Sequence, residues 1–320
     1  MSERAVTVII PVFHGDQWVP ACLKSLLAHA DEDVRVWLVD NHGNSDLSHW
    51  TEYDERVRII HVDGPLPFAE VNDRVLCQER IHTPFVCFLN QDTVSDENWL
   101  RRCIDVLQSS AWLGAVTPWL LDYAAERPEP AILSCLPEGL QQRPVSVTGF
   151  QCTEVVPATA LVCRWDALLR TGPFDPVFQS YYEDFDLCDR LQEHDFGVAI
   201  VHAVSVRHQA GSATTTPAAA LRRARNVLRN RVIRRLRRSQ SNRITVLFDV
   251  LLLEFPRRTL RALARRPGAA PLRAVLGAAW DVLMLSPRMV SEARDKAAWR
   301  RDLVRLGWPD EMSGSRDASS

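Results

Sequence analysis

The sequence predicts an α/β protein built on a doubly wound, mostly parallel sheet. In the first 120 residues, short apolar runs rich in β-branched residues alternate with stretches of helical periodicity, the pattern of consecutive β-α-β units. Each run ends in a polar or kinked segment, and ligands of such sheets bind at the carboxyl ends of the strands. With 46% hydrophobic and 24% charged residues, the composition excludes a collagen, a coiled coil or a disordered chain.

The elements are expected in the following order. The apolar runs predict buried parallel strands over residues 6–12, 34–40, 57–62 and 85–89. Helical periodicity predicts helices over residues 18–30, 71–81 and 99–108. A proline-rich loop follows Pro118, and after it we expect a strand over 155–163, a short helix over 165–170, a helix beginning at Glu183, and a pair of strands over 198–201 and 204–206.

The last third of the chain has a different charge. From residue 221 onward there are 22 Arg and one Lys against nine Asp or Glu, a net charge of +14, whereas the part before it has a net charge of −16. The pattern is helical from Pro217 to about residue 306, and the last dozen residues have the composition of a disordered tail. We therefore divide the chain into an α/β domain (1–216), a basic helical region (217–308) and a tail (309–320).

The sequence predicts a cytoplasmic protein. No apolar run reaches the roughly 18 residues of a membrane-spanning helix, and the short apolar run near the start reads as a strand rather than a signal peptide. Eight cysteines occur singly without a C-x-x-C pair, which favours buried free thiols over a zinc site or disulfides.

The basic helical region permits three interpretations. Its apolar stretches at 244–255 and 274–285, together with its arginines, could lie on the anionic inner surface of a membrane. They could instead pack on the α/β domain or form a homodimer interface. No zinc, helix-turn-helix or aromatic-stacking motif accompanies the arginines, so no binding of nucleic acid is expected.

Asp92 is the first candidate for a chemical role. It comes just after a buried strand, in the run FLNQDT, where a carboxylate suits a hard cation such as Mg²⁺ or Mn²⁺. It could instead cap the next helix, a role for which Asp96 is better placed. Asp40, after the second strand, could hydrogen-bond a base or ribose, or only cap a turn.

Glu183 and Asp184 form an acidic pair at the start of a predicted helix, followed by Asp186 and Asp189. The helix dipole favours acids in a first turn, but four acids within seven residues exceed that need. Crowded carboxylates raise one another's pKa values, and one of them is then suited to act as a general base. His208, after an apolar strand, could be a metal ligand or a buried core histidine.

Six segments together resemble the inverting glycosyltransferases of family 2, of the GT-A type, and most closely their bacterial rhamnosyltransferase-like branch. In order, they are VIIPVF (8–13), VDN (39–41), FAEVND (68–73), FLNQDT (88–93), GPFDPVFQSYYEDFDLCDRL (172–191) and VRHQAGS (206–212). The resemblance extends from residue 5 to about residue 240. It implies a GT-A fold, Rossmann-like, with a C-terminal helical region.

The resemblance also implies roles for individual residues. Asp92 would bind the metal with His208 as second ligand, and Asp184 would be the general base with Glu183 beside it. The nucleotide would be bound by Pro11, Val12, Phe13 and Asp40 at the base, with Asn72 and Asn90 near it.

The activity implied is transfer of a hexosyl or deoxyhexosyl group, with inversion and with help from Mg²⁺ or Mn²⁺. The donor would be a dTDP- or UDP-sugar, and the acceptor a hydroxyl of a saccharide, a lipid-linked saccharide or a small-molecule aglycone. In two places the sequence departs from the family: Asn90 replaces the first Asp of the D-x-D motif, and segment 68–73 lacks the usual glycines. A non-catalytic relative that binds sugar nucleotides, or a scaffold protein, therefore remains the alternative.

Overall fold

The computed structural model describes most of the α/β part and three separate stretches of the helical region. The described residues are 2–14, 17–31, 33–41, 47–136, 149–210, 216–238, 243–250, 253, 256–257 and 269–289. The predicted tail, 309–320, lies outside them.

Nine strands of the described residues form one sheet in the order β3-β2-β1-β4-β8-β6-β9-β5, and β7 pairs with β9 beside this path. The strands are β1 (Val6–Val12), β2 (Val34–Asp40), β3 (Val57–His61), β4 (Phe85–Leu89), β5 (Thr93–Ser95), β6 (Leu113–Asp122), β7 (Phe150–Thr153), β8 (Ala160–Arg164) and β9 (Gly197–His208).

The four strands predicted for the first part of the chain are confirmed as parallel neighbours. β1 lies between β2 and β4, and β3 extends the sheet beyond β2. The other half of the sheet is mixed. β6 runs parallel to β9, whereas β8 is antiparallel to both β4 and β6, and β5 and β7 are antiparallel to β9.

Three predictions for the second half were wrong. The loop expected after Pro118 contains the end of β6, which runs to Asp122, and a short helix over Pro130–Ser134. The strand expected over 155–163 begins only at Ala160. Pro157 has no N–H, and the N–H groups of its neighbours Val156 and Ala158 bind side chains of a helix instead of a strand. The two strands expected over 198–206 are one strand, β9, whose register against β6 shifts between Val201 and Ser205.

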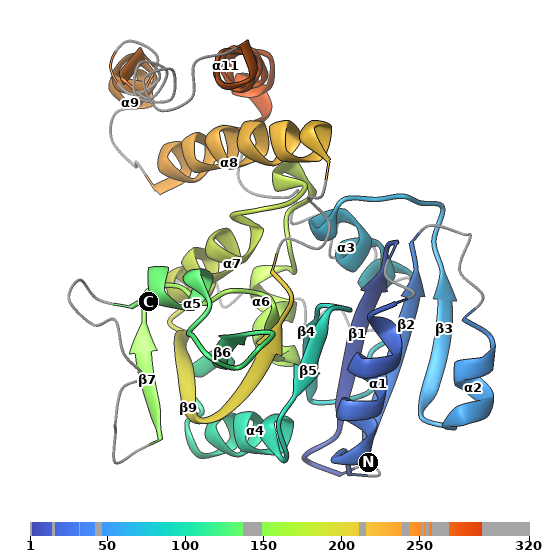
Figure 1. Cartoon of the computed structure of the whole chain (residues 1–320). Coiled ribbons are helices and arrows are strands. Elements are labelled where there is room, and N and C mark those ends of the chain that lie inside the picture. Colours follow the sequence, from blue (N-terminus) through green and yellow to red (C-terminus); the bar gives the residue numbers. More distant parts are fainter. Residues whose placement is uncertain are drawn as a thin grey trace.

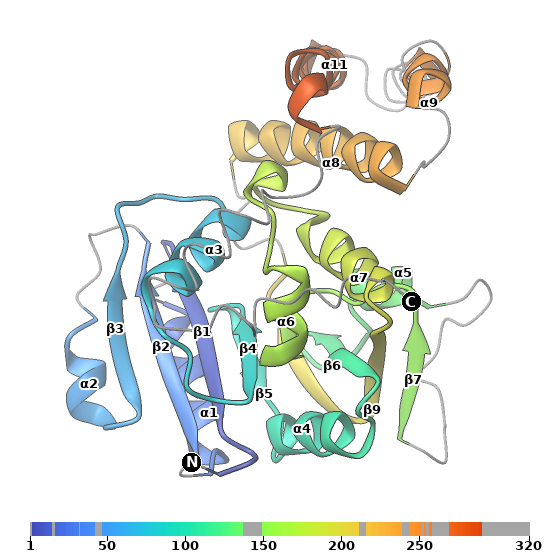
Figure 2. The same ribbon diagram turned by 180° about the vertical axis from the view of Figure 1, so that it is seen from behind.

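The helices lie on both faces of the sheet, with α1 in front of β1 in Figure 1 and α3 and α6 in front in the reverse view of Figure 2. They are α1 (Val19–Ala28), α2 (His49–Tyr53), α3 (Phe68–Gln78), α4 (Trp99–Ser109), α5 (Pro130–Ser134), α6 (Trp165–Thr171), the 3₁₀ helix η1 (Pro176–Phe178), α7 (Glu183–Glu193), α8 (Pro217–Arg238), α9 (Arg243–Asp249) and α11 (Ala269–Met289). The helices predicted within the α/β part are confirmed, except that α3 lies three residues earlier than expected at both ends. Of the helical pattern predicted to about residue 306, residues 290–306 lie outside the described residues.

The hydrophobic core has two parts. The larger part contains the sheet and the helices that flank it. The smaller part joins α8 to α11 and the residue after α9, and includes Phe178 from the α/β part. Figure 1 accordingly shows α8 lying between the α/β part on one side and α9 and α11 on the other. Within the described residues, no helix combines the length and the apolar composition that crossing a membrane requires.

Candidate functional site

The carboxyl ends of β1, β2 and β4 meet at one edge of the sheet and are tied together there. The backbone N–H of Phe13 donates to Gln91 Oε1 (2.9 Å), and Gln91 Nε2 donates to the Phe13 carbonyl (2.8 Å). The N–H of Asn41 donates to the carbonyl of Val12 (3.1 Å). The polar segments that follow the three strands therefore lie side by side, as the ends of neighbouring parallel strands must.

The residues predicted to hold the base differ in exposure. Val12 is a core residue and Pro11 is half-buried, whereas the Phe13 side chain is 36% exposed. Asp40 is buried, and its Oδ2 lies 3.2 Å from Nδ1 of His61 on the neighbouring strand. Phe13 thus offers the largest accessible surface of this group.

Asn72 is fully buried on α3. Its Nδ2 donates to the carbonyl of Phe68 one turn earlier (2.8 Å), and its Oδ1 has no hydrogen-bond partner within the described part of the chain. The contacts that the structure shows for this side chain belong to its own helix, so a role near a nucleotide stays a proposal.

Asp92 lies in the turn that connects β4 to β5. Thr93 Oγ1 donates to the Asn90 carbonyl (2.8 Å) and closes the turn, and the Asp92 carbonyl accepts from the N–H of Gln209 (3.0 Å). Thr93 also stands opposite His208 in the β5–β9 ladder. The register of two strands far apart in the sequence therefore brings Asp92 and His208 together.

Neither Asp92 nor Asp96 caps the following helix. The N-cap of α4 is Asn98, which makes no side-chain capping hydrogen bond. Asp96 instead accepts a short hydrogen bond from the hydroxyl of Ser205 on β9. The alternative that Asp92 caps the next helix is therefore wrong.

His208 lies between two carboxylates. Its Nε2 is 3.2 Å from Asp92 Oδ1 and 3.2 Å from Asn90 Nδ2, while its Nδ1 is 3.0 Å from Glu129 Oε1. The three ionisable side chains are 6%, 5% and 9% exposed for Asp92, Glu129 and His208. Burial alone would lower the pKa of His208, but the hydrogen bonds and charges of the two carboxylates raise it to about 9.

This cluster fits a divalent cation in the chemistry of its donor atoms. Carboxylate oxygen and imidazole nitrogen both bind Mn²⁺, and Glu129 on Nδ1 turns Nε2 of His208 toward Asp92, as carboxylates do beside metal-binding histidines. In the part of the chain that is described, no three His, Cys, Asp or Glu side chains are arranged to hold a metal by themselves. A cation between Asp92 and His208 would therefore take further ligands from a bound molecule, as Mg²⁺ does with phosphates.

Glu129 was not among the residues predicted from the sequence. It stands between two prolines, directly before α5, in a stretch that the sequence predicts as a loop. One of its oxygens, Oε2, is buried and lacks a hydrogen-bond partner within the described residues. No local signal marks this residue, because its partner His208 is brought to it only by the fold.

The Glu183–Asp184 pair opens α7, as predicted. Asp184 is half-buried; its Oδ2 accepts from the N–H of Ala158 (3.2 Å) and its Oδ1 from the N–H of Phe185 (2.9 Å). Glu183 is buried, and its Oε2 has no hydrogen-bond partner in the described part of the molecule.

Burial sets the ionisation of this pair. It raises the pKa of Asp184 to about 6, although hydrogen bonds from the N–H groups of Ala158 and Phe185 oppose the shift. Burial, and then the charge of Asp184, raise the pKa of Glu183 well above its usual range. Asp184 is therefore the member of the pair that is ionised at neutral pH, and an ionised carboxylate can accept a proton.

Two connections join Asp184 to the His208 cluster. Thr159, next to Ala158, accepts a hydrogen bond from the N–H of Asn90 through its carbonyl (2.9 Å). The second connection is α5, which has Glu129 directly before it and Cys135 directly after it. Burial and, to a smaller extent, the charge of Asp184 raise the pKa of Cys135 to about 12, so this end of α5 lies near Asp184.

A surface hollow of about 690 Å³ lies elsewhere, lined by residues that include Arg4, Phe85 and Arg164. Phe85 begins β4 and Arg4 precedes β1, so the hollow lies at the amino ends of these strands. The guanidinium of Arg164 donates to the carbonyls of Leu107 and Leu113. The hollow therefore lies at the opposite edge of the sheet from the predicted site residues.

Comparison with protein families gives two matches. The model described as glycosyl transferase family 2 matches residues 7–126, and the one described as glycosyl transferase family group 2 matches residues 85–299, more than half of the chain. Among curated proteins, the pre-mycofactocin glycosyltransferase of Mycobacterium tuberculosis (strain CDC 1551 / Oshkosh) is 29% identical over 199 residues. That alignment covers 60% of this chain and 40% of the relative's length.

Solved structures share the fold. TarS from S. aureus matches with a TM-score of 0.56 and 12% identity, over 96% of this chain and 88% of that chain. The mannosyltransferase PcManGT from Pyrobaculum calidifontis, in complex with GDP-Man and Mn²⁺, matches with a TM-score of 0.56 and 14% identity, over 95% and 87%. GalNAc-T7 with UDP, GalNAc and Mn²⁺ matches with a TM-score of 0.53 and 10% identity, over 82% and 58%. The expected GT-A fold is thereby confirmed.

Proposed function

We propose that this chain, which belongs to glycosyl transferase family group 2, transfers a sugar from a nucleotide diphosphate sugar to an acceptor hydroxyl, with inversion at the anomeric carbon. One observation carries the proposal: Asp92 contacts His208, and Asp184 is joined to them through Ala158, Thr159 and Asn90. Displacement of a diphosphate needs a cation at the leaving group and an acceptor for the hydroxyl proton, and this edge has acids for both.

Asp92 and His208 are the residues that would hold Mg²⁺ or Mn²⁺, with the Asn90 side chain beside them and Glu129 orienting the imidazole. When bound, the cation supplies Lewis-acid stabilisation of the negative charge that develops on the departing diphosphate. The structures of GalNAc-T7 and PcManGT, which contain Mn²⁺, support this part of the proposal.

Asp184 would be the general base, with Glu183 beside it. As the acceptor oxygen bonds to the anomeric carbon, the bond from that carbon to the diphosphate oxygen breaks, and the hydroxyl proton passes to an oxygen of Asp184. Attack from the face opposite the diphosphate inverts the configuration in one displacement. No covalent sugar–enzyme intermediate is expected.

For the donor we propose a dTDP- or UDP-sugar, bound at its base by Pro11, Val12, Phe13 and Asp40, with Asn72 near the nucleotide. The exposed ring of Phe13 supports this, because an aromatic face can stack on a base. The neighbours bind UDP and GDP-Man, which supports a nucleoside diphosphate but not one base. We place the chain in the rhamnosyltransferase-like branch, with a saccharide, lipid-linked saccharide or small-molecule aglycone as acceptor.

A non-catalytic relative that binds sugar nucleotides is the second candidate, favoured by Asn90 in place of an acidic residue. Incubating the protein and its Asp184→Asn variant with labelled UDP- and dTDP-sugars and Mn²⁺ separates the two. Hydrolysis or transfer by the parent protein that is lost in the variant supports the enzyme. Binding of a nucleotide sugar without turnover by the parent protein supports the second candidate.

We also propose that the helical region, 217–308, brings the protein to the anionic inner surface of the cytoplasmic membrane. Helix α11 exposes Leu272, Leu276, Trp280 and Leu283, which are 40%, 60%, 61% and 54% exposed. Their spacing of three or four residues places them on one face of the helix, and Arg273 is exposed at its border.

The opposite face of α11 is occupied. Val275, Ala278 and Val282 are buried against α8 in the smaller core. The exposed apolar stripe has a basic border, and the chain from residue 221 onward has a net charge of +14, so this surface is complementary to anionic lipid. A second copy of the chain is the alternative occupant of this stripe.

A further inference from the structure

The segment that leads into the Glu183–Asp184 pair has an unusual backbone. Between η1 and α7, Gln179, Tyr181 and Tyr182 have φ values of 61°, 74° and 70°, in the left-handed region that side chains with a Cβ disfavour. Such residues persist only where surrounding contacts fix them. The path of the backbone into Glu183 and Asp184 therefore depends on the contacts that hold residues 179–182.

Asn230 of α8 holds this segment. The side chain is fully buried, and its Nδ2 lies 2.6 Å from the Phe178 carbonyl, 2.9 Å from the Ser180 carbonyl and 2.6 Å from the Tyr181 carbonyl. An amide nitrogen has two hydrogens, so three acceptors around it share them. One side chain thus binds the backbone carbonyls of Phe178, Ser180 and Tyr181, which include or directly adjoin the left-handed positions.

Arg229 fixes the orientation of that amide. It is 4% exposed, and its Nε donates to Asn230 Oδ1 (2.8 Å). Its Nη2 donates to the carbonyls of Val177 (3.2 Å) and Phe178 (2.8 Å). Because a guanidinium only donates, Oδ1 must face Arg229 and Nδ2 must face the segment.

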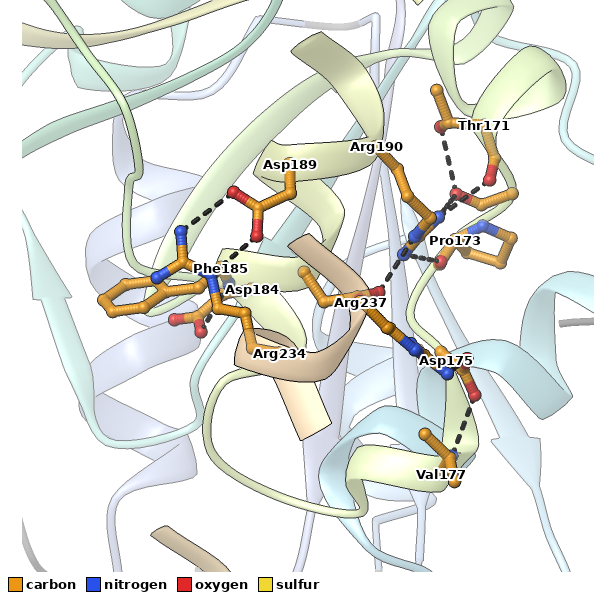
Figure 3. A network of polar contacts seen from close by, with 12 residues as sticks. Thr171, Pro173, Asp175, Val177, Asp184, Phe185, Asp189, Arg190, Arg234 and Arg237 are labelled. Atoms are coloured by element: carbon orange, nitrogen blue, oxygen red, sulfur yellow. Dashed lines mark hydrogen bonds and ion pairs between the residues drawn. The ribbon is translucent and has the colours of Figure 1, made fainter. Parts of the chain in front are cut away.

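The same helix also holds the chain after the acidic pair, as Figure 3 shows. Arg234 donates to both oxygens of Asp189 (2.6 and 2.8 Å), and its guanidinium lies 5.2 Å from the centre of the Phe185 ring. Arg237 bridges Asp186 and Asp175, at 2.8 Å from each. Helix α8 therefore binds the polypeptide both before and after Glu183 and Asp184.

We infer that Asn230, oriented by Arg229, is a positioning residue that sets the geometry of Asp184 through residues 178–181. The inference rests on the proposed role of Asp184 as base. Without the amide, the carbonyls of Ser180 and Tyr181 lose this donor, the Phe178 carbonyl keeps only Arg229, and the left-handed backbone loses a contact that stabilises it. Asp184 then leaves the position in which it meets Ala158 and the acceptor, while the nucleotide edge at Phe13 and Asp40 is untouched.

Asn230→Leu tests the inference, since leucine has a similar volume and no donor. The matched control is Val282→Ala, which weakens the packing of α11 on α8 in the smaller core but leaves the hydrogen-bond donors to residues 178–181 in place. For both full-length variants we would measure kcat, the Kd of UDP and dTDP with Mn²⁺, the Tm, and hydrogen–deuterium exchange of backbone amides over 178–186.

For Asn230→Leu we expect kcat to fall at least about tenfold, nucleotide Kd to change less than about twofold, and amide exchange over 178–186 to accelerate. For Val282→Ala we expect a lower Tm with kcat and this exchange unchanged. Equal exchange in the two variants, or a parent-like kcat in Asn230→Leu, overturns the inference. If Asn230→Leu does not fold, Arg229→Gln is measured in its place, with the same expected and opposing results.

The Asp184→Asn variant distinguishes a failure of the proposed base role of Asp184 from a failure of the positioning role of Asn230. If that variant turns over normally, the base is wrongly assigned, and the exchange data still decide whether Asn230 holds residues 178–181. If Asp184→Asn is inactive while Asn230→Leu is fully active, the proposed function stands and the positioning role is refuted.

Discussion

The N–H of Ala158 donates to Oδ2 of Asp184 over 3.2 Å, which fixes the carboxylate beside the end of β4. Thr159, the next residue, binds Asn90 in the turn that carries Asp92. The residue proposed to take the acceptor's proton and the residue proposed to hold the metal are thus attached to one short piece of backbone.

Replacing Asp184 by Asn should lower turnover at least about 100-fold, the size of a general-base contribution, because an amide cannot take a proton. The fold and donor binding should be kept, since the Asn oxygen can still accept from Ala158. Steady-state kinetics with calorimetry of nucleotide binding checks this. Glu193→Gln, on the exposed side of the same helix, is the control and should retain parent activity. Near-normal turnover in folded Asp184→Asn protein refutes the assignment.

The pH dependence of kcat should follow the ionisation of Asp184. Burial raises the pKa of this acid to about 6. The ionisable groups that face it are Glu183, Cys188, Cys135 and Arg234. A base acts only when deprotonated, so kcat should be level above that pKa and fall as the pH drops through it. A rate profile between about pH 4.5 and 8.5 measures this. A rate that stays level down to pH 4.5 contradicts the prediction.

Replacing Glu129 by Gln should weaken Mn²⁺ affinity about 10- to 100-fold, the usual effect of losing a carboxylate that orients a metal-binding histidine. A calorimetric titration with Mn²⁺ in the presence of UDP or dTDP gives this affinity. Glu126→Gln, an exposed acid of the preceding turn, should change nothing. Parent-like affinity in Glu129→Gln shows that the carboxylate does not orient a ligand.

The stripe on α11 should bind anionic membranes. Each basic residue near the surface contributes about 1 kcal/mol, so sedimentation with anionic liposomes should weaken as salt rises. Replacing Leu276 and Trp280 by Ser should abolish sedimentation, whereas Trp112→Ser, at a ring 51% exposed on the α/β part, should preserve it. No binding by the folded protein at low salt refutes the membrane proposal, and a dimer dissociated by the Leu276 and Trp280 changes identifies a second copy as occupant.

The fold was predictable where local sequence determines structure. Strands β1, β2 and β4 are almost entirely buried and appear as apolar runs, the edge strand β3 is partly exposed but keeps enough apolar residues to be recognised, and α7 begins at the predicted acidic pair. The strand start at Ala160 could not be predicted, because the apolar residues before it look like a strand while their N–H groups bind α7.

The site was predictable to the extent that its residues follow strands. Asp92 lies in the turn after β4 and His208 ends β9, and their meeting follows from the β5–β9 register. Glu129 and Asn230 could not be identified: the first lies in a loop, and the second lies in an arginine-rich run that suggests a solvated or membrane-facing helix. Their roles come from contacts 79 and 49 to 52 residues away in the sequence, which no local pattern reports.

The central claim is that the edge formed by Asp92 and His208 binds a nucleoside diphosphate through a divalent cation. Calorimetry of UDP and dTDP binding, with Mn²⁺ or with excess chelator, to the parent protein and to Asp92→Ala tests it most directly. We predict binding to the parent protein that requires Mn²⁺ and is abolished in folded Asp92→Ala, because the neutral Asn90 cannot replace a carboxylate. Equal affinity in the variant, or parent affinity unchanged by chelator, would contradict the account.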